Sequence, residues 1–130
     1  MKAKRVAVLA GVLALGMGLG VALAQAPAIQ RIIIDRADTR ADQEAVLARA
    51  EFPAGGDTGL HYHHGLELGT VLEGTVQVTV EGQPPKLYHP GEAFLIPSEA
   101  HHRAMAVGGP AKLAAVYVVD KGKPLAEPVK

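Results

Sequence analysis

The chain has 130 residues, 48% of them apolar, and carries 13 basic and 13 acidic side chains. This length allows one domain with a packed core. A formal net charge of zero argues against a nucleic-acid binder that relies on bulk electrostatics, and three tyrosines with two phenylalanines are too few for base-stacking platforms. Because the chain has no cysteine, disulfides, iron–sulfur clusters and thiolate metal sites are excluded.

Residues 1–24 have the organisation of a secretory signal peptide. A basic start precedes an apolar run over 6–21, and Ala22-Leu23-Ala24 has the small-x-small pattern of a cleavage site before Gln25. We therefore predict a periplasmic or secreted protein with no stable membrane insertion after cleavage. The alternative is a retained N-terminal anchor, since the segment is just long enough to span a bilayer.

The next segment, 25–43, is predicted to be an N-terminal strand and loop. Ile32-Ile33-Ile34 is a β-branched run that suits a buried strand. The stretch 35–44 has six charged residues in ten and is expected to be a solvated loop.

Residues 44–121 are predicted to form a β-barrel, followed by a turn-rich, loose C-terminal tail at 122–130. Apolar residues alternate with polar ones over 46–52 and 75–80, as in half-buried strands, and 116–119 is a β-branched run. Glu73-Gly74 and Glu81-Gly82 are typical of hairpin turns. Short strands with frequent glycine and proline indicate an all-β sandwich or barrel, and closing the sheet removes its exposed edges.

Five of the six histidines fall in two short clusters, while His89 is expected to be a surface residue. In an extended strand, side chains two residues apart point to the same face, so His61 and His63 aim at one volume. Glu67 begins a strand that can run antiparallel beside the first. Two imidazoles and a carboxylate make the facial set of non-haem metal sites, and the candidates for a fourth ligand are His101 and His102. Each residue alone has a simpler interpretation, so the inference rests on their joint occurrence.

These residues resemble the first motif of the cupin family, G-x5-H-x-H-x3,4-E-x6-G, which is filled at every fixed position from Gly55 to Gly74. The second motif, G-x5-P-x-G-x2-H-x3-N, is partly filled, with Glu99 in place of glycine and Ala106 in place of asparagine. The register of this second motif selects His102, and not His101, as the fourth ligand. The resemblance implies a double-stranded β-helix, the cupin jelly-roll barrel. It also implies one divalent transition metal ion (Fe, Mn, Zn, Cu or Ni) held by His61, His63, Glu67 and His102.

The resemblance leaves the function open, because cupins include enzymes, binding modules and storage proteins. We expect an exported single-domain metal-binding cupin, with a dioxygenase or isomerase acting on a small oxygen-bearing organic molecule as one hypothesis. A non-catalytic periplasmic metal or small-ligand binder is the second, and a β-roll with a vestigial site is the third. A homodimer through 29–34 is a further expectation. The candidates for supporting groups are Tyr62, His64 and His101, and those for pocket lining are Phe52, Leu72, Val78 and Phe94.

Overall fold

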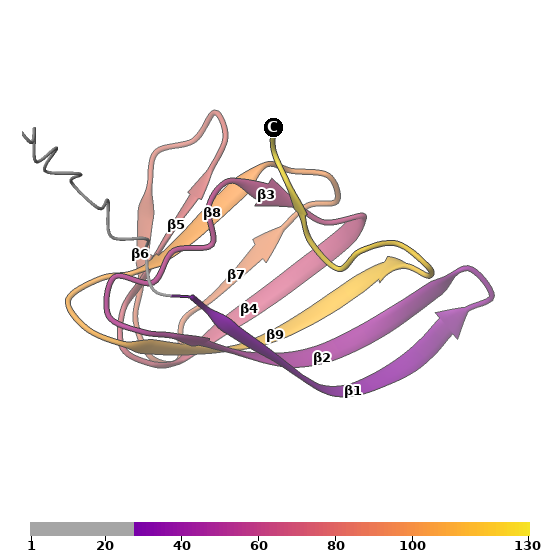
Figure 1. Ribbon diagram of the computed structural model, residues 1–130, viewed down its shortest axis with the longest axis horizontal. Helices are drawn as coiled ribbons and strands as arrows, with labels where there is room; N and C mark the ends of the chain where they lie inside the picture. Colours follow the sequence, from indigo (N-terminus) through magenta and orange to yellow (C-terminus); the bar gives the residue numbers. More distant parts are fainter. Residues whose placement is uncertain (1–27) are drawn as a thin grey trace, which may run out of the picture.

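Two antiparallel five-stranded sheets make up the computed structural model, which describes residues 28–130, and no helix occurs among these residues (Figure 1). The predicted signal peptide lies outside the described residues. The first sheet has the order β1-β2-β9-β4-β7 and the second β10-β3-β8-β5-β6. The strands are β1 (Gln30–Arg40), β2 (Gln43–Phe52), β3 (His61–Tyr62), β4 (Gly65–Glu73), β5 (Val76–Val80), β6 (Lys86–Tyr88), β7 (Ala93–Ile96), β8 (His102–Ala106), β9 (Ala111–Asp120) and β10 (Glu127–Pro128).

The core lies between the two sheets, and the alternation of the sequence decides which residues enter it. In β2, the even-numbered residues from Val46 to Phe52 are buried, while Leu47 between them is exposed. Val76 and Val78 of β5 are buried in the same way from the second sheet. The larger of two core clusters contains side chains of both sheets, and the smaller contains Val46 and Ala48 with residues of β9. The predicted all-β fold is confirmed for residues 28–130.

The predicted loop over 35–44 is wrong, because β1 and β2 form a long hairpin with only residues 41–42 in the turn. All of β1 is exposed, so its charges stay in water while the backbone keeps its strand hydrogen bonds. Arg36 also makes a cross-strand ion pair with Glu44 at 2.7 Å. A high density of charge therefore marked a solvated strand here. Ile32, Ile33 and Ile34 lie in a strand as predicted but are 36%, 39% and 55% exposed.

One further connection, the C-terminal segment and Leu72 also differ from the predictions. Glu73 ends β4 and Gly74 is a bend, but this connection joins β4 of one sheet to β5 of the other instead of closing a hairpin. Glu81-Gly82, by contrast, does lie between the paired strands β5 and β6. The C-terminal segment is not loose: Glu127 and Pro128 form β10, which pairs with β3, and Figure 1 shows this yellow segment returning past β3. Leu72, predicted to line the pocket, is 48% exposed.

Among residues 28–130, no helix is long and apolar enough to cross a membrane.

Candidate metal centre

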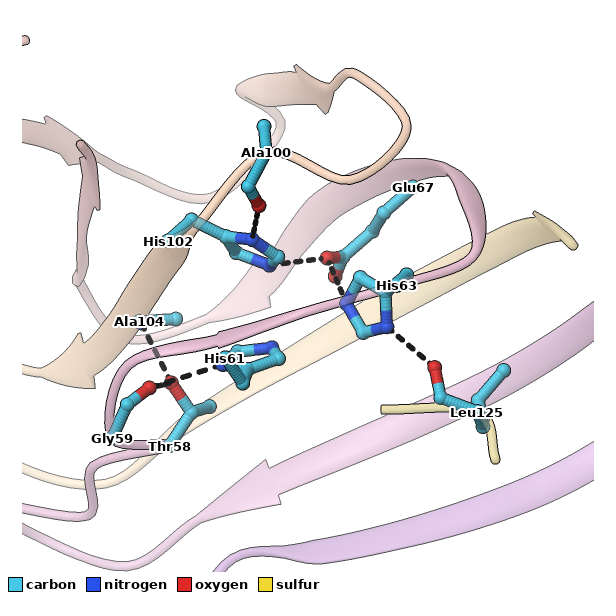
Figure 2. A network of polar contacts seen from close by, with 9 residues as sticks. All are labelled: Thr58, Gly59, His61, His63, Glu67, Ala100, His102, Ala104 and Leu125. Atoms are coloured by element: carbon cyan, nitrogen blue, oxygen red, sulfur yellow. Dashed lines mark hydrogen bonds and ion pairs between the residues drawn. The ribbon is translucent and has the colours of Figure 1, made fainter. Parts of the chain in front are cut away.

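Four side chains from distant positions of the chain converge in the interior, namely His61, His63, Glu67 and His102. One ligand atom from each lies within 4.8 Å of the others. All four residues are buried, with at most 6% of their surface exposed. Figure 2 shows the imidazoles gathered around the carboxylate of Glu67. The residues named from the sequence as metal ligands therefore share one buried volume.

The site joins the two sheets. His61 of β3 lies directly opposite His102 of β8 in the second sheet, and their ring centroids are 4.2 Å apart. Glu67 comes from β4 in the first sheet, so the prediction that its strand pairs with that of the histidines is wrong. The chain passes from β3 in the second sheet to β4 in the first at Gly65, where a Cβ would lie 2.0 Å from the Val118 carbonyl oxygen. No side chain fits at this close approach of β4 to β9.

Backbone carbonyls fix the orientation of the three imidazole rings. The Nδ1 atoms of His61, His63 and His102 lie 3.0, 2.6 and 2.8 Å from the carbonyl oxygens of Gly59, Leu125 and Ala100. A carbonyl oxygen can only accept a hydrogen bond, so each Nδ1 carries a proton and donates it. In the neutral rings, each Nε2 therefore keeps a lone pair. Hydrogen bonds of this kind commonly orient histidines that ligate metals.

The Nε2 atoms of His63 and His102 both face Glu67 Oε2, at 2.9 and 3.0 Å. Neutral imidazoles in this tautomer would direct lone pairs at a carboxylate oxygen, so the cluster needs a cation. A second proton on an imidazole or a shared metal ion satisfies it. Ligands about 2.1 Å from an ion and at right angles to each other lie about 3 Å apart, which matches both separations. The donor set, nitrogen and oxygen without sulfur, fits a divalent first-row transition metal.

The electrostatics favour an ionised Glu67 and an unprotonated His61. Burial raises the pKa of Glu67, but the hydrogen bonds that His102 and His63 donate to it when their Nε2 atoms are protonated outweigh burial and hold the pKa at about 2. Burial lowers the pKa of His61 to about 4, in spite of the opposing hydrogen bond to the Gly59 carbonyl. Glu67 is therefore ionised and His61 unprotonated at neutral pH, the states in which both can ligate a metal.

The three residues predicted as supporting groups lie on the outer side of the histidine strands. The Tyr62 hydroxyl donates to Glu127 at 2.6 Å, and His101 contacts Glu81 at 2.7 Å. His64 bonds Glu99 through Nδ1 at 3.0 Å and Glu127 through Nε2 at 2.9 Å. Because both partners are carboxylates, His64 is a cation between them, and its pKa is raised, first of all by Glu127. These contacts hold β10 and the 97–100 turn in place behind His63.

The sequence pattern of the cupin domain matches residues 48–119, which is more than half of the chain. The chain belongs to the cupin family. No curated protein matches it.

Solved structures of cupins share its fold. A cupin superfamily protein from Desulfitobacterium hafniense is 16% identical, with a TM-score of 0.61 over 76% of this chain and 84% of that one. The DMSP lyase DddQ from Ruegeria pomeroyi is 22% identical, with a TM-score of 0.61 over 65% of this cupin and 43% of the lyase. An oxalate oxidase in complex with the substrate analogue glycolate is 26% identical, with a TM-score of 0.57 over 65% and 46%. This cupin thus spans less than half the length of the two enzymes.

Two residues of the site were missed from the sequence. Tyr117 of β9 lies opposite Glu67 in the first sheet, and its ring centroid is 4.9 Å from that of His63. Burial, reinforced by the charge of Glu67, raises the pKa of Tyr117 to about 12, so the phenol keeps its proton. Its signal was its place in the β-branched run 116–119: side chains two apart on a strand share a face, and Tyr117 and Val119 are both buried. The second residue is Arg31, whose guanidinium carbon lies 5.8 Å from the Tyr117 ring centroid.

The space beside the ligands has a narrow inner part and a wider outer part. The inner part, about 10 Å³, is lined by His61, Glu67, His102 and Tyr117, with Phe52 and Phe94 among the apolar residues. The outer part, about 290 Å³, lies against His61 between the N-terminal strand and the C-terminal segment. Both parts are lined by Ile29, Arg31, Thr58 and His61, so the outer pocket leads to the four candidate metal ligands of this cupin.

Proposed function

We propose that this protein is an exported, metal-dependent cupin enzyme that acts on a small oxygen-bearing organic molecule. The observation that carries the proposal is the buried cluster of four donors, three of them oriented by carbonyls, next to a pocket of about 290 Å³. The cupin structures of a DMSP lyase and an oxalate oxidase support an enzyme, since both are named for reactions of small organic molecules.

Each residue of the centre has a part in this chemistry. His61, His63, Glu67 and His102 would hold the ion, and the bound ion would polarise a coordinated substrate oxygen as a Lewis acid. The carbonyls at Gly59, Leu125 and Ala100 hold the three rings, so little reorganisation is needed on binding. Tyr117 keeps its proton beside His63 and can donate a hydrogen bond to a substrate atom. The apolar lining around the inner space limits the entry of water.

The first experiment is elemental analysis of the protein purified from the envelope of its own cell, alongside His63→Ala and His101→Ala. His101 is the matched control, because it lies beside His102 yet contacts Glu81 on the outer side. We expect one divalent ion per chain in the wild type and in His101→Ala, and little in His63→Ala. Stoichiometric metal in His63→Ala would exclude the proposed centre.

The second experiment separates an enzyme from a binder. The metal-loaded protein is incubated in air with small hydroxy and oxo acids, sugars and phenols, and products are followed by mass spectrometry. A product that needs the metal and His63 supports the enzyme. A melting temperature that rises with a compound, without any product, supports instead a non-catalytic binding protein.

Export is the part of the proposal supported by the basic start, apolar run and Ala22-Leu23-Ala24 of the sequence. When the full chain is expressed, cell fractionation should find its shortened, cleaved form in the envelope. When a chain without residues 2–24 is expressed, it should stay in the cytosol. An uncleaved chain in the membrane fraction would favour the anchor.

A homodimer through β1 is also proposed. β1 is the edge strand of the first sheet and exposes Ile32, Ile33 and Ile34, and exposed apolar edges favour pairing with another strand. Light scattering should give twice the chain mass for the wild type and a lower mass for Ile32→Thr with Ile34→Thr. A monomeric wild type would contradict the proposal.

A further inference from the structure

The outer pocket has one charged side chain, Arg31, that pairs with no carboxylate among residues 28–130. Asp57 lines it, but both of its oxygens accept hydrogen bonds from Arg103, with Nε 2.7 Å from Oδ1 and 2.9 Å from Oδ2. The Thr58 hydroxyl is also committed, because it donates to the Gly59 carbonyl and accepts from the Ala104 amide, both at 2.9 Å. Arg31 alone among these charged groups forms no ion pair with any carboxylate in residues 28–130.

Arg31 is held at the junction of the two spaces. Its guanidinium lies over the face of Tyr117, 5.8 Å from the ring centroid, within the range of a cation–π contact. The Tyr117 ring in turn lies 4.9 Å from the His63 ring, so one aromatic ring separates the cation from a metal ligand. Arg31 lines the inner space as well as the outer pocket, so its charge faces a molecule that occupies either.

The size of the two spaces limits the shape of that molecule. An inner space of about 10 Å³ holds roughly one water-sized group beside the ligands. The rest of the molecule must lie in the outer pocket, next to Arg31. With Asp57 neutralised by Arg103, Arg31 is the one charge in the lining of the outer pocket without an oppositely charged partner among residues 28–130, which matches a monoanion. The planar guanidinium fork matches a carboxylate in a two-point contact.

We propose that Arg31 is the anion anchor of this pocket, and that the ligand is a small monocarboxylate with a hydroxyl or oxo oxygen on the carbon next to the carboxylate. The carboxylate pairs with Arg31, and the neighbouring oxygen enters the inner space toward the four donors. This inference rests on the proposed function for the metal, whereas the pairing with Arg31 needs only the pocket. The anchor comes from β1, which lies before the segment matched by the cupin pattern.

Calorimetric titration tests the proposal with two acids, lactate and mandelate, each compared with its primary amide. The amides keep the shape and lose the charge. The proteins are the wild type, Arg31→Gln, Arg31→Lys and the control Arg36→Gln, which removes a cation of the same strand that pairs with Glu44. At least one acid should bind the wild type and Arg36→Gln, with its amide about tenfold weaker or more. Arg31→Gln should lose about tenfold or more of the acid affinity, and Arg31→Lys should lose less.

Equal affinity of acid and amide, unchanged acid binding in Arg31→Gln, or no binding of either acid would overturn the inference. Circular dichroism and metal content of the variants show that the fold and the centre are intact, as expected for an exposed residue. The titrations are run with metal-loaded and with chelator-treated protein. If the protein binds no metal and turns over no compound, but still prefers the acid through Arg31, the enzyme is contradicted and the anchor is kept. Bound metal with no preference for the acid contradicts the anchor alone.

Discussion

Replacing Glu99 by glycine should stabilise this protein, because Glu99 is the one non-glycine residue with a positive φ, 63°, among residues 28–130. For an L-amino acid this left-handed conformation costs roughly 1–2 kcal/mol. Glycine also gains freedom in the unfolded chain, which opposes the effect by about 0.4–1 kcal/mol. The expected net gain in the free energy of unfolding, from the backbone alone, is about 1 kcal/mol. The turn matters for the centre because the Glu99 amide donates to the His63 carbonyl at 3.0 Å.

The side chain of Glu99 complicates a direct comparison with the wild type, since it accepts a hydrogen bond from His64 Nδ1 at 3.0 Å. Glu99→Ala is therefore the reference: it lacks the carboxylate, as the glycine variant does, but keeps the Cβ. The difference between Glu99→Gly and Glu99→Ala isolates the backbone. Ser98→Gly is the matched control, because Ser98 is exposed in the same turn and has no positive φ.

Urea unfolding followed by circular dichroism, in the presence of a chelator, measures these differences. Glu99→Gly should exceed Glu99→Ala by about 1 kcal/mol, or about 4 °C in melting temperature for a domain of this size. Ser98→Gly should leave the stability unchanged or lower it. A Glu99→Gly variant no more stable than Glu99→Ala would refute the argument that the turn is strained by a side chain at this position.

Three other predictions concern the centre and its walls. His102→Ala should reduce the bound metal, measured by elemental analysis, far more than His101→Ala. The reason is that His102 is 2% exposed and faces Glu67, whereas His101 contacts Glu81. The reverse order would contradict the ligand set. Gly69→Ala should destabilise the protein by about 1–3 kcal/mol in urea unfolding, since the new Cβ would lie 2.2 Å from the Phe94 ring; an unchanged midpoint would mean that the ring moves freely. The pKa of Asp57 is lowered, first by the hydrogen bond from Arg103, so it is lower in the folded than in the unfolded chain. Its stabilising contribution is therefore complete above about pH 4 and is lost as the pH falls through the folded value. The stability difference between the wild type and Asp57→Asn should shrink in unfolding experiments from pH 6 to pH 3, and a constant difference would contradict the ion pair.

The sequence was informative about the fold where local periodicity decides the outcome. Strict alternation over 46–52 predicted a half-buried strand, and β2 buries the expected residues. The same rule turned Tyr62 away from His61 and His63. Positions that depend on distant pairing were not predictable in this way. The charged stretch 35–44 became a strand because a partner strand was within reach, and Glu73-Gly74 joined two sheets because β4 found its partners elsewhere.

The candidate site shows the same division. The motif spacing named four side chains that the structure brings together, since it reflects how the strands of a cupin align. Arg31 and Leu125 could not be inferred, because they lie before and after the motifs and reach the centre only through the packing of β1 and β10. Nothing in the local sequence distinguishes Arg31 from Arg36, which lies on the same strand and pairs with Glu44. Only the pocket that Arg31 lines separates the two.

The hydrogen bond from His63 Nδ1 to the Leu125 carbonyl has a consequence for how the centre is assembled during synthesis. A growing chain that has emerged as far as Asp120 already contains all four donors of the candidate centre and the strands β1 to β9. It still lacks the acceptor that holds the His63 ring, which arrives with the next few residues. Domains generally fold as units, and here β2 and β4 both pair with the late strand β9. The orientation of the His63 ring therefore depends on the segment around Leu125, which follows all four donors in the chain.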